Sequence, residues 1–104
     1  MIYVIGWLTV KPGKRGELMD LLAPAIAKNR REDGCLFYEV HPSATDGDVL
    51  VFVEGWANTE AHQAHQRAPH HTTAVDHVVR LSVRGRFEEI EAAKVNSVTP
   101  EFAA

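Results

Sequence analysis

Three stretches of the chain are apolar on both alternating faces, a pattern typical of β-strands that are covered on both sides. They are residues 2–10 (IYVIGWLTV), 35–41 (CLFYEVH) and 49–56 (VLVFVEGW). Residues 42–48, PSATDGD, are rich in turn formers and have the length of a hairpin connection. The pattern therefore predicts three strands, and the last two are expected to pair antiparallel.

Apolar positions change to a helical period after the turn KPGK at 11–14. The predicted helix begins at Arg15 and has one stripe of regularly spaced residues, namely Leu18, Leu21, Leu22, Ala25, Ile26 and Asn29. Pro24 lies inside this helix and should bend it locally. Gly34, beyond the basic end of the helix, suits a left-handed cap.

Two further helices are expected after the third strand. Asn58 or Thr59 can cap a short helix, and Pro69 fits the first turn of the next one. The apolar stripe of the second helix consists of Ala74, Val75, Val78 and Leu81.

The segment 84–95 is ambiguous between helix and strand. Phe87, Ile90 and Ala93 have helical spacing, whereas Gly85 and the need for a fourth strand favour a strand. With a strand here, the order is β-α-β-β-α-β. This order is the ferredoxin-like α+β fold with a four-stranded antiparallel sheet.

The domain is expected to span residues 1–95, followed by a tail at 96–104 that is loosely ordered or lies on a partner. Helices can cover only one face of such a sheet, yet the first three strands are apolar on both faces. A second copy of the chain, packed sheet to sheet, would cover the other face. The pattern thus predicts a homodimer.

Composition narrows the class of protein. The 104 residues suffice for one domain with a real core, and the formal charge of −3, evenly mixed, argues against nucleic-acid and anionic-membrane partners. The single cysteine, Cys35, cannot form an internal disulfide, and an inert, buried thiol is expected. The apolar N-terminus lacks a basic region and a cleavage site and is too short to span a bilayer, so we expect a cytoplasmic protein.

The segment 54–71, EGWANTEAHQAHQRAPHH, concentrates the groups that could carry chemistry. It contains Trp56 and four of the six histidines. A partly buried histidine suits acid–base work because its ordinary pKa is close to neutrality. We therefore look for the functional site in this segment.

Four features of the chain resemble the antibiotic biosynthesis monooxygenase domain family of the dimeric α+β barrel superfamily. They are the first strand with KPGK and an amphipathic helix, the strand EDGCLFYEVH, the strand end VEGW followed by NTEA, and the spacing from Trp56 to His65 with His70-His71 after a proline. The resemblance covers about residues 2–92.

The resemblance implies a cofactor-independent monooxygenase that oxidises a small aromatic hydroxy, quinol or anthrone-type substrate with O2. Other members of the family isomerise or modify small molecules, or degrade haem. The haem-degrading branch has an asparagine and a tryptophan where this chain has Gly6 and His65, although His77 could supply the iron ligand. The non-enzymatic alternative is a dimer that binds a small ligand, or a stress-related dimer, without catalytic turnover.

Oxygen insertion without metal or flavin needs a base, a dry pocket and donors for the developing oxyanion. His65 is the candidate base, and Trp56, Tyr38, Trp7, His62 and His71 are candidates for substrate contact. Each aromatic residue also has a structural interpretation, since a tryptophan or tyrosine in an apolar strand is often part of the core or of a dimer interface.

The histidines also have other interpretations. His65 could be a hydrogen-bonded helix residue without function, and His62, His70 and His71 could be solvated. His62 and His65 share a helical face and could bind a metal with His70 or His71, but the spacing is no recognised zinc signature. We therefore expect neither a metal nor another cofactor.

Overall fold

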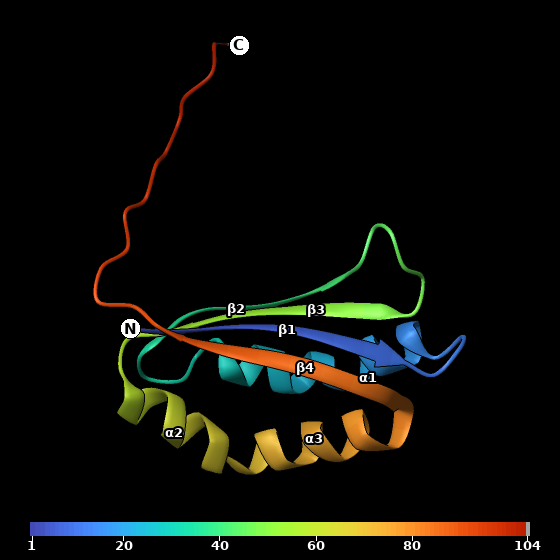
Figure 1. The fold of residues 1–104 in the computed structure, drawn as a ribbon. Coiled ribbons are helices and arrows are strands. Elements are labelled where there is room, and N and C mark those ends of the chain that lie inside the picture. Colours follow the sequence, from blue (N-terminus) through green and yellow to red (C-terminus); the bar gives the residue numbers. More distant parts are fainter. Residues whose placement is uncertain (104) are drawn as a thin grey trace.

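The computed structural model describes residues 1–103, which form one sheet with three helices on one of its faces (Figure 1). The elements in chain order are β1 (Ile2–Val10), α1 (Arg15–Asn29), β2 (Cys35–Pro42), β3 (Val49–Trp56), α2 (Thr59–Arg67), α3 (Pro69–Leu81) and β4 (Ser82–Glu91). All strand pairs are antiparallel, in the order β2-β3-β1-β4. The predicted ferredoxin-like α+β fold is confirmed.

The ambiguous C-terminal segment is a strand, β4, which begins two residues before the predicted segment. It pairs with β1 along its length, with Gly6 opposite Phe87 and Val4 opposite Glu89. Beyond this ladder, the amino group of Met1 donates to the carbonyl of Ala92 at 3.1 Å, and the Ala92 N–H returns a hydrogen bond at 2.9 Å. The first strand therefore lies in the middle of the sheet, between β3 and β4.

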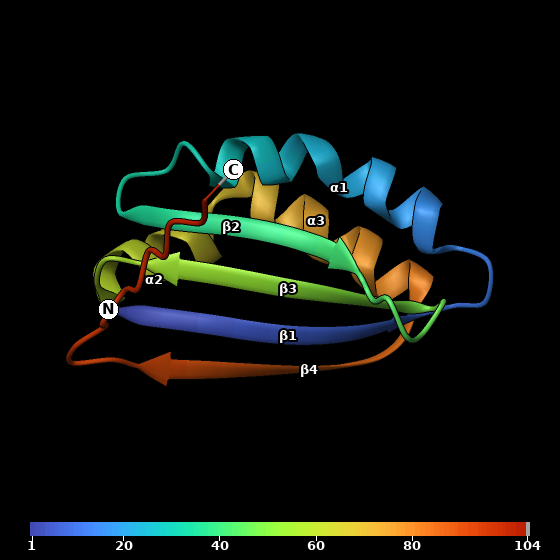
Figure 2. The same ribbon diagram turned by 90° about the horizontal axis from the view of Figure 1, so that it is seen from above.

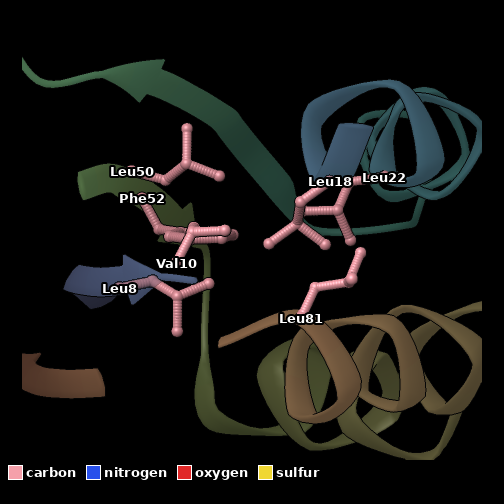
Figure 3. Packing of buried hydrophobic residues seen from close by; sticks show 7 residues of the cluster. All are labelled: Leu8, Val10, Leu18, Leu22, Leu50, Phe52 and Leu81. Carbon is pink, nitrogen blue, oxygen red and sulfur yellow. The ribbon is translucent and has the colours of Figure 1, made fainter. Parts of the chain in front are cut away.

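The core lies between the sheet and the helices because alternate residues of β1 and β3 point toward the helices. One cluster fills the middle of this layer, with residues from β1, β3, α1 and α3 (Figure 3). It consists of Leu8, Val10, Leu18, Leu22, Leu50, Phe52 and Leu81. A second cluster, of Ile2, Val4, Tyr38 and Trp56, lies toward α2.

The position of α2 depends on Gly34, in the turn before β2. Gly34 has a φ of 79°, which favours glycine, and a Cβ there would lie 2.5 Å from the Cβ of Ala61 on α2. Asn58 caps the same helix by accepting a hydrogen bond from the Ala61 N–H at 2.9 Å, as predicted. These two contacts place the first turn of α2 against the sheet end.

The face of the sheet opposite the helices is uncovered in the described part of the chain (Figures 1 and 2). It carries Tyr3, Ile5 and Trp7 of β1 beside Val51 and Val53 of β3, all half-buried or exposed. Residues 96–103 contain neither helix nor strand and extend away from the sheet on this side, and the last residue of the predicted tail lies outside the described residues. No helix among residues 1–103 combines the length and apolar character needed to cross a membrane.

Candidate active site

A cavity of about 400 Å³ lies between the sheet and the helices, where the two core clusters meet. Its apolar wall includes Val4, Leu22 and Phe52. Its polar lining consists of Asn29, Tyr38, Glu54, His62, His65, Gln66, His71 and Glu89. A mostly apolar cavity of this size with a few polar groups is the usual form of a small-molecule site.

His65 lies in the wall of this cavity and is only 2 % exposed. Its Nδ1 is 3.0 Å from Oε1 of Glu32, a residue of the segment between α1 and β2. The same oxygen is 2.6 Å from Nε2 of His70, at the start of α3. The carboxylate of Glu32 therefore holds two imidazole rings from two helices.

The environment of His65 favours the neutral imidazole. Burial lowers the pKa of His65, and the hydrogen bond and charge of Glu32 oppose this effect only in part. A neutral ring that donates its Nδ1 proton to Glu32 keeps a lone pair on Nε2. Within residues 1–103, no hydrogen bond occupies Nε2, so this atom is free to accept a proton.

Trp56 supports His65 from behind and does not line the cavity. Its indole is fully buried and stacks on the His65 ring, with 4.6 Å between the ring centroids. Its Nε1 donates a hydrogen bond of 3.0 Å to Oε1 of Glu54. One indole thus positions both the candidate base and a buried carboxyl group, whereas the sequence had suggested a substrate contact for it.

Glu54 is a site residue that the sequence analysis missed. It is 6 % exposed and points toward the helices from β3, on the same face as Leu50, Phe52 and Trp56. Burial raises the pKa of Glu54 to about 7, against the hydrogen bond from Trp56, and the charges of Glu89 and Glu32 add to the rise. The available signal was an acidic residue at an inward position of an apolar strand.

Replacing Glu54 by glutamine should change how stability depends on pH. Between its ordinary pKa of 4.5 and the folded value of about 7, the folded chain keeps a proton that the unfolded chain has released. The stability of the wild type should therefore fall as pH rises through this window, by on the order of 3 kcal/mol. E54Q lacks this loss and should be the more stable protein at about pH 8.

Urea unfolding of both proteins at about pH 5 and about pH 8 measures this difference. The contributions of His65 and His71, whose pKa values are lowered by burial, are present in both proteins and cancel. If the free energy of unfolding changed equally with pH in the wild type and in E54Q, the pKa of Glu54 would not be raised in the folded protein.

Tyr38 and Asn29 also belong to the polar lining of the cavity. Tyr38 pairs with Glu54 across the ladder between β2 and β3, and burial raises the pKa of its hydroxyl, which stays protonated. Asn29, at the end of α1, is 2 % exposed, and its Oδ1 has no hydrogen-bond partner among the described residues. A buried carbonyl oxygen without a partner is costly and marks a place where a ligand or water can donate.

The structure places the other candidate residues at different sites. His62 and His71 line the cavity, and His62 is 7 % exposed, in contrast to the solvated position considered for it. The ring of His71 packs edge-on against His65 at 4.6 Å, and burial lowers its pKa. Trp7 lies on the uncovered sheet face, with the Arg86 guanidinium 4.7 Å above its ring, and takes no part in the cavity.

Two cofactor hypotheses can be compared with the geometry. One ligand atom each of Glu32, His65 and His70 lies within 4.8 Å of the others, so this trio could hold a cation, in place of the hydrogen bonds that it makes. A side chain at Gly6, the position at which the resemblance places the asparagine of the haem-degrading branch, would meet the Phe87 ring at 2.3 Å. His77 is engaged with Arg80 at 2.9 Å and is not part of the cavity lining.

Comparison with known proteins agrees with the fold and with the class of protein. The sequence model of the family "Antibiotic biosynthesis monooxygenase" matches residues 1–77. A Mycobacterium tuberculosis protein named "Putative monooxygenase Rv0793" is 36% identical over 70 residues, which are 67% of this chain and 68% of that protein. Its solved structure has a TM-score of 0.83 at 29% identity and covers 92% of this chain and 98% of that one.

Two further relatives show how far the similarity extends. A Synechocystis protein named "Uncharacterized protein sll1783" is 33% identical over 69 residues, or 66% of this chain, and the match spans about half (47%) of that protein. The crystal structure of a "putative antibiotic biosynthesis monooxygenase" from Deinococcus radiodurans has a TM-score of 0.86 at 26% identity, covering 96% of this chain and 100% of that one.

Proposed function

Because the chain belongs to the antibiotic biosynthesis monooxygenase family, we propose that it oxidises a small aromatic hydroxy compound with O2, without a metal or flavin. The substrate class is a phenol, quinol or anthrone that becomes electron-rich on losing a proton. The observation that carries the proposal is His65, a buried imidazole in the wall of an apolar cavity, where burial lowers its pKa.

The proposed reaction begins with proton transfer from the substrate hydroxyl, or from the activated methylene of an anthrone, to Nε2 of His65. Glu32 stabilises the resulting imidazolium through Nδ1, as an acceptor already in place at 3.0 Å. The substrate anion gives one electron to O2, the two radicals combine into a peroxide, and loss of water leaves a new carbonyl group. The substrate supplies all four electrons, so no external reductant is required.

Oxygen uptake by the metal-stripped protein tests this function. We expect quinols, naphthols and anthrones to be consumed above their autoxidation background, with one O2 taken up for each carbonyl formed. The O-methyl ethers of the same phenols and quinols have no acidic hydroxyl and should be inert. Equal uptake with the ethers would contradict proton abstraction, and no uptake across the panel would favour a protein that only binds its ligand.

We also propose that a second copy of the chain covers the uncovered face of the sheet. The support is the apolar row formed by Tyr3, Ile5, Val51 and Val53, which no part of residues 1–103 shields. Apolar faces of this kind are typical of homodimer interfaces. Light scattering of the purified protein should give twice the monomer mass, and a monomer would contradict the proposal.

A further inference from the structure

The end of the cavity near Glu54 presents hydrogen-bond acceptors to a ligand. Glu54 receives one hydrogen bond, from Trp56 to Oε1, which leaves its other oxygen free. Asn29 contributes an Oδ1 that is buried and has no partner in the described chain. Both residues line the cavity, as does Tyr38, which pairs with Glu54 on the sheet.

Of the lysine, arginine and carboxyl groups of the described chain, only carboxyls line the cavity near Glu54 and Asn29, so the charge that these groups carry there is negative. Glu89 of β4 lies on the other side of Val4 from Glu54, because both glutamates pair with Val4. Among the described residues that line the cavity, none is a lysine or arginine. An anionic group placed here would meet two carboxyls without a cation to compensate for its lost hydration.

Neutral donor groups, unlike anions, should bind favourably at this end of the cavity. A hydroxyl group can donate to the free oxygen of Glu54 or to Oδ1 of Asn29, and thereby satisfies an acceptor that is otherwise buried without a partner. A hydrogen bond to a carboxylate is among the stronger kinds that a binding site can offer. The wall should therefore select ligands by the donors they carry.

We propose that Glu54 and Asn29 form a second polar subsite, which binds an un-ionised donor group of the substrate while His65 takes the proton of another. The preferred ligand class is then an aromatic diol, and aromatic carboxylates are excluded. This proposal rests on the proposed function for its substrate class, and the subsite itself is measurable by binding alone. The two polar subsites sit on one support, since Trp56 contacts both His65 and Glu54.

Calorimetric titration without oxygen tests the subsite, since no turnover can then occur. The probes are a naphthalenediol, its monomethyl ether and the hydroxynaphthoate with the same skeleton, at about pH 8, above the pKa of about 7 of Glu54. The wild type should bind the diol at least about tenfold more tightly than either analogue, as expected for one charge-assisted hydrogen bond.

Variants assign the selectivity to named residues. E54Q should reduce the preference for the diol over the hydroxynaphthoate to about threefold or less, because the buried one of the two repelling carboxyls is gone while the shape is kept. Asn29→Ala should weaken binding of the diol and leave the rejection of the carboxylate intact. The matched control is E60Q, which removes an exposed glutamate of α2 that is not part of the cavity lining.

The outcomes separate this subsite from the proposed reaction. Diol selectivity that E54Q abolishes supports the subsite even in a protein that consumes no oxygen. Equal binding of the carboxylate, selectivity unchanged in E54Q, or no binding of any probe to the folded wild type would overturn it, even if oxygen uptake is observed with other substrates.

Discussion

Asparagine at position 65 should lower the rate of oxygen uptake by about 10²- to 10⁴-fold, the usual contribution of a positioned general base. The amide can still donate a hydrogen bond to Glu32, but it cannot accept a proton at neutral pH. The variant should remain folded, since the rings of Trp56 and His71 that pack on His65 stay in place. Initial rates on a substrate that the wild type consumes, together with circular dichroism, measure both effects.

Two further variants separate the base from its surroundings. E32Q keeps the shape of the acceptor but loses the charge that stabilises the imidazolium, and we expect a smaller loss, of about tenfold. His77→Asn changes a histidine of α3 that is bound to Arg80 outside the cavity, and its rate should equal that of the wild type. Full activity in H65N would place the base elsewhere, with Glu54 the next candidate.

Alanine at position 56 should cost about 3–5 kcal/mol of folding free energy, the usual loss for a buried tryptophan. Trp56 is fully buried, so the cavity left behind would lie directly against His65 and Glu54. A domain of this size is stable by about 5–15 kcal/mol in total, so W56A should lose a substantial share of its stability. Urea unfolding of the variant and the wild type gives the difference.

Phenylalanine at the same position divides this loss into its parts. W56F keeps an aromatic ring but removes the Nε1–H that donates a hydrogen bond to Glu54. This loss should cost about 1–3 kcal/mol of folding free energy. A double-mutant cycle with E54Q isolates the part of that hydrogen bond that depends on the carboxyl group, since glutamine keeps a neutral acceptor, and W7F serves as the control for the loss of an indole elsewhere. A W56A protein as stable as the wild type would mean that the indole is not the common support of the site.

Strands and helices could be predicted where burial imposes a period on the sequence. β1, β2 and β3 are apolar because they supply buried residues to the two core clusters, and α1 has the stripe that packs on the sheet. The strand β4 gave no such signal, since nine of its ten residues are exposed. It becomes a strand through its ladder with β1, a contact that no local pattern reveals.

The site was predictable only in its local part. The four histidines of residues 62–71 are near one another in the sequence; three of them line the cavity, and His70 shares Glu32 with one of these three. Glu32 lies 33 residues before His65, so only the fold brings the two together. Trp56 is at a position of its strand where side chains point into the core. This alternation alone cannot tell whether an inward-pointing ring contacts a ligand or lies behind another side chain.

The place of β1 at the centre of the sheet has a consequence for synthesis on the ribosome. The strand made first forms one of its two ladders with the strand made last, and Met1 is hydrogen-bonded to Ala92. Until Glu91 has left the exit tunnel, one edge of the nascent N-terminal strand lacks its partner, and the cavity lacks the wall that includes Phe87 and Glu89. Contacts between such distant parts of a chain slow folding and expose unpaired strands to aggregation, so the domain can be completed only after β4 has emerged from the ribosome.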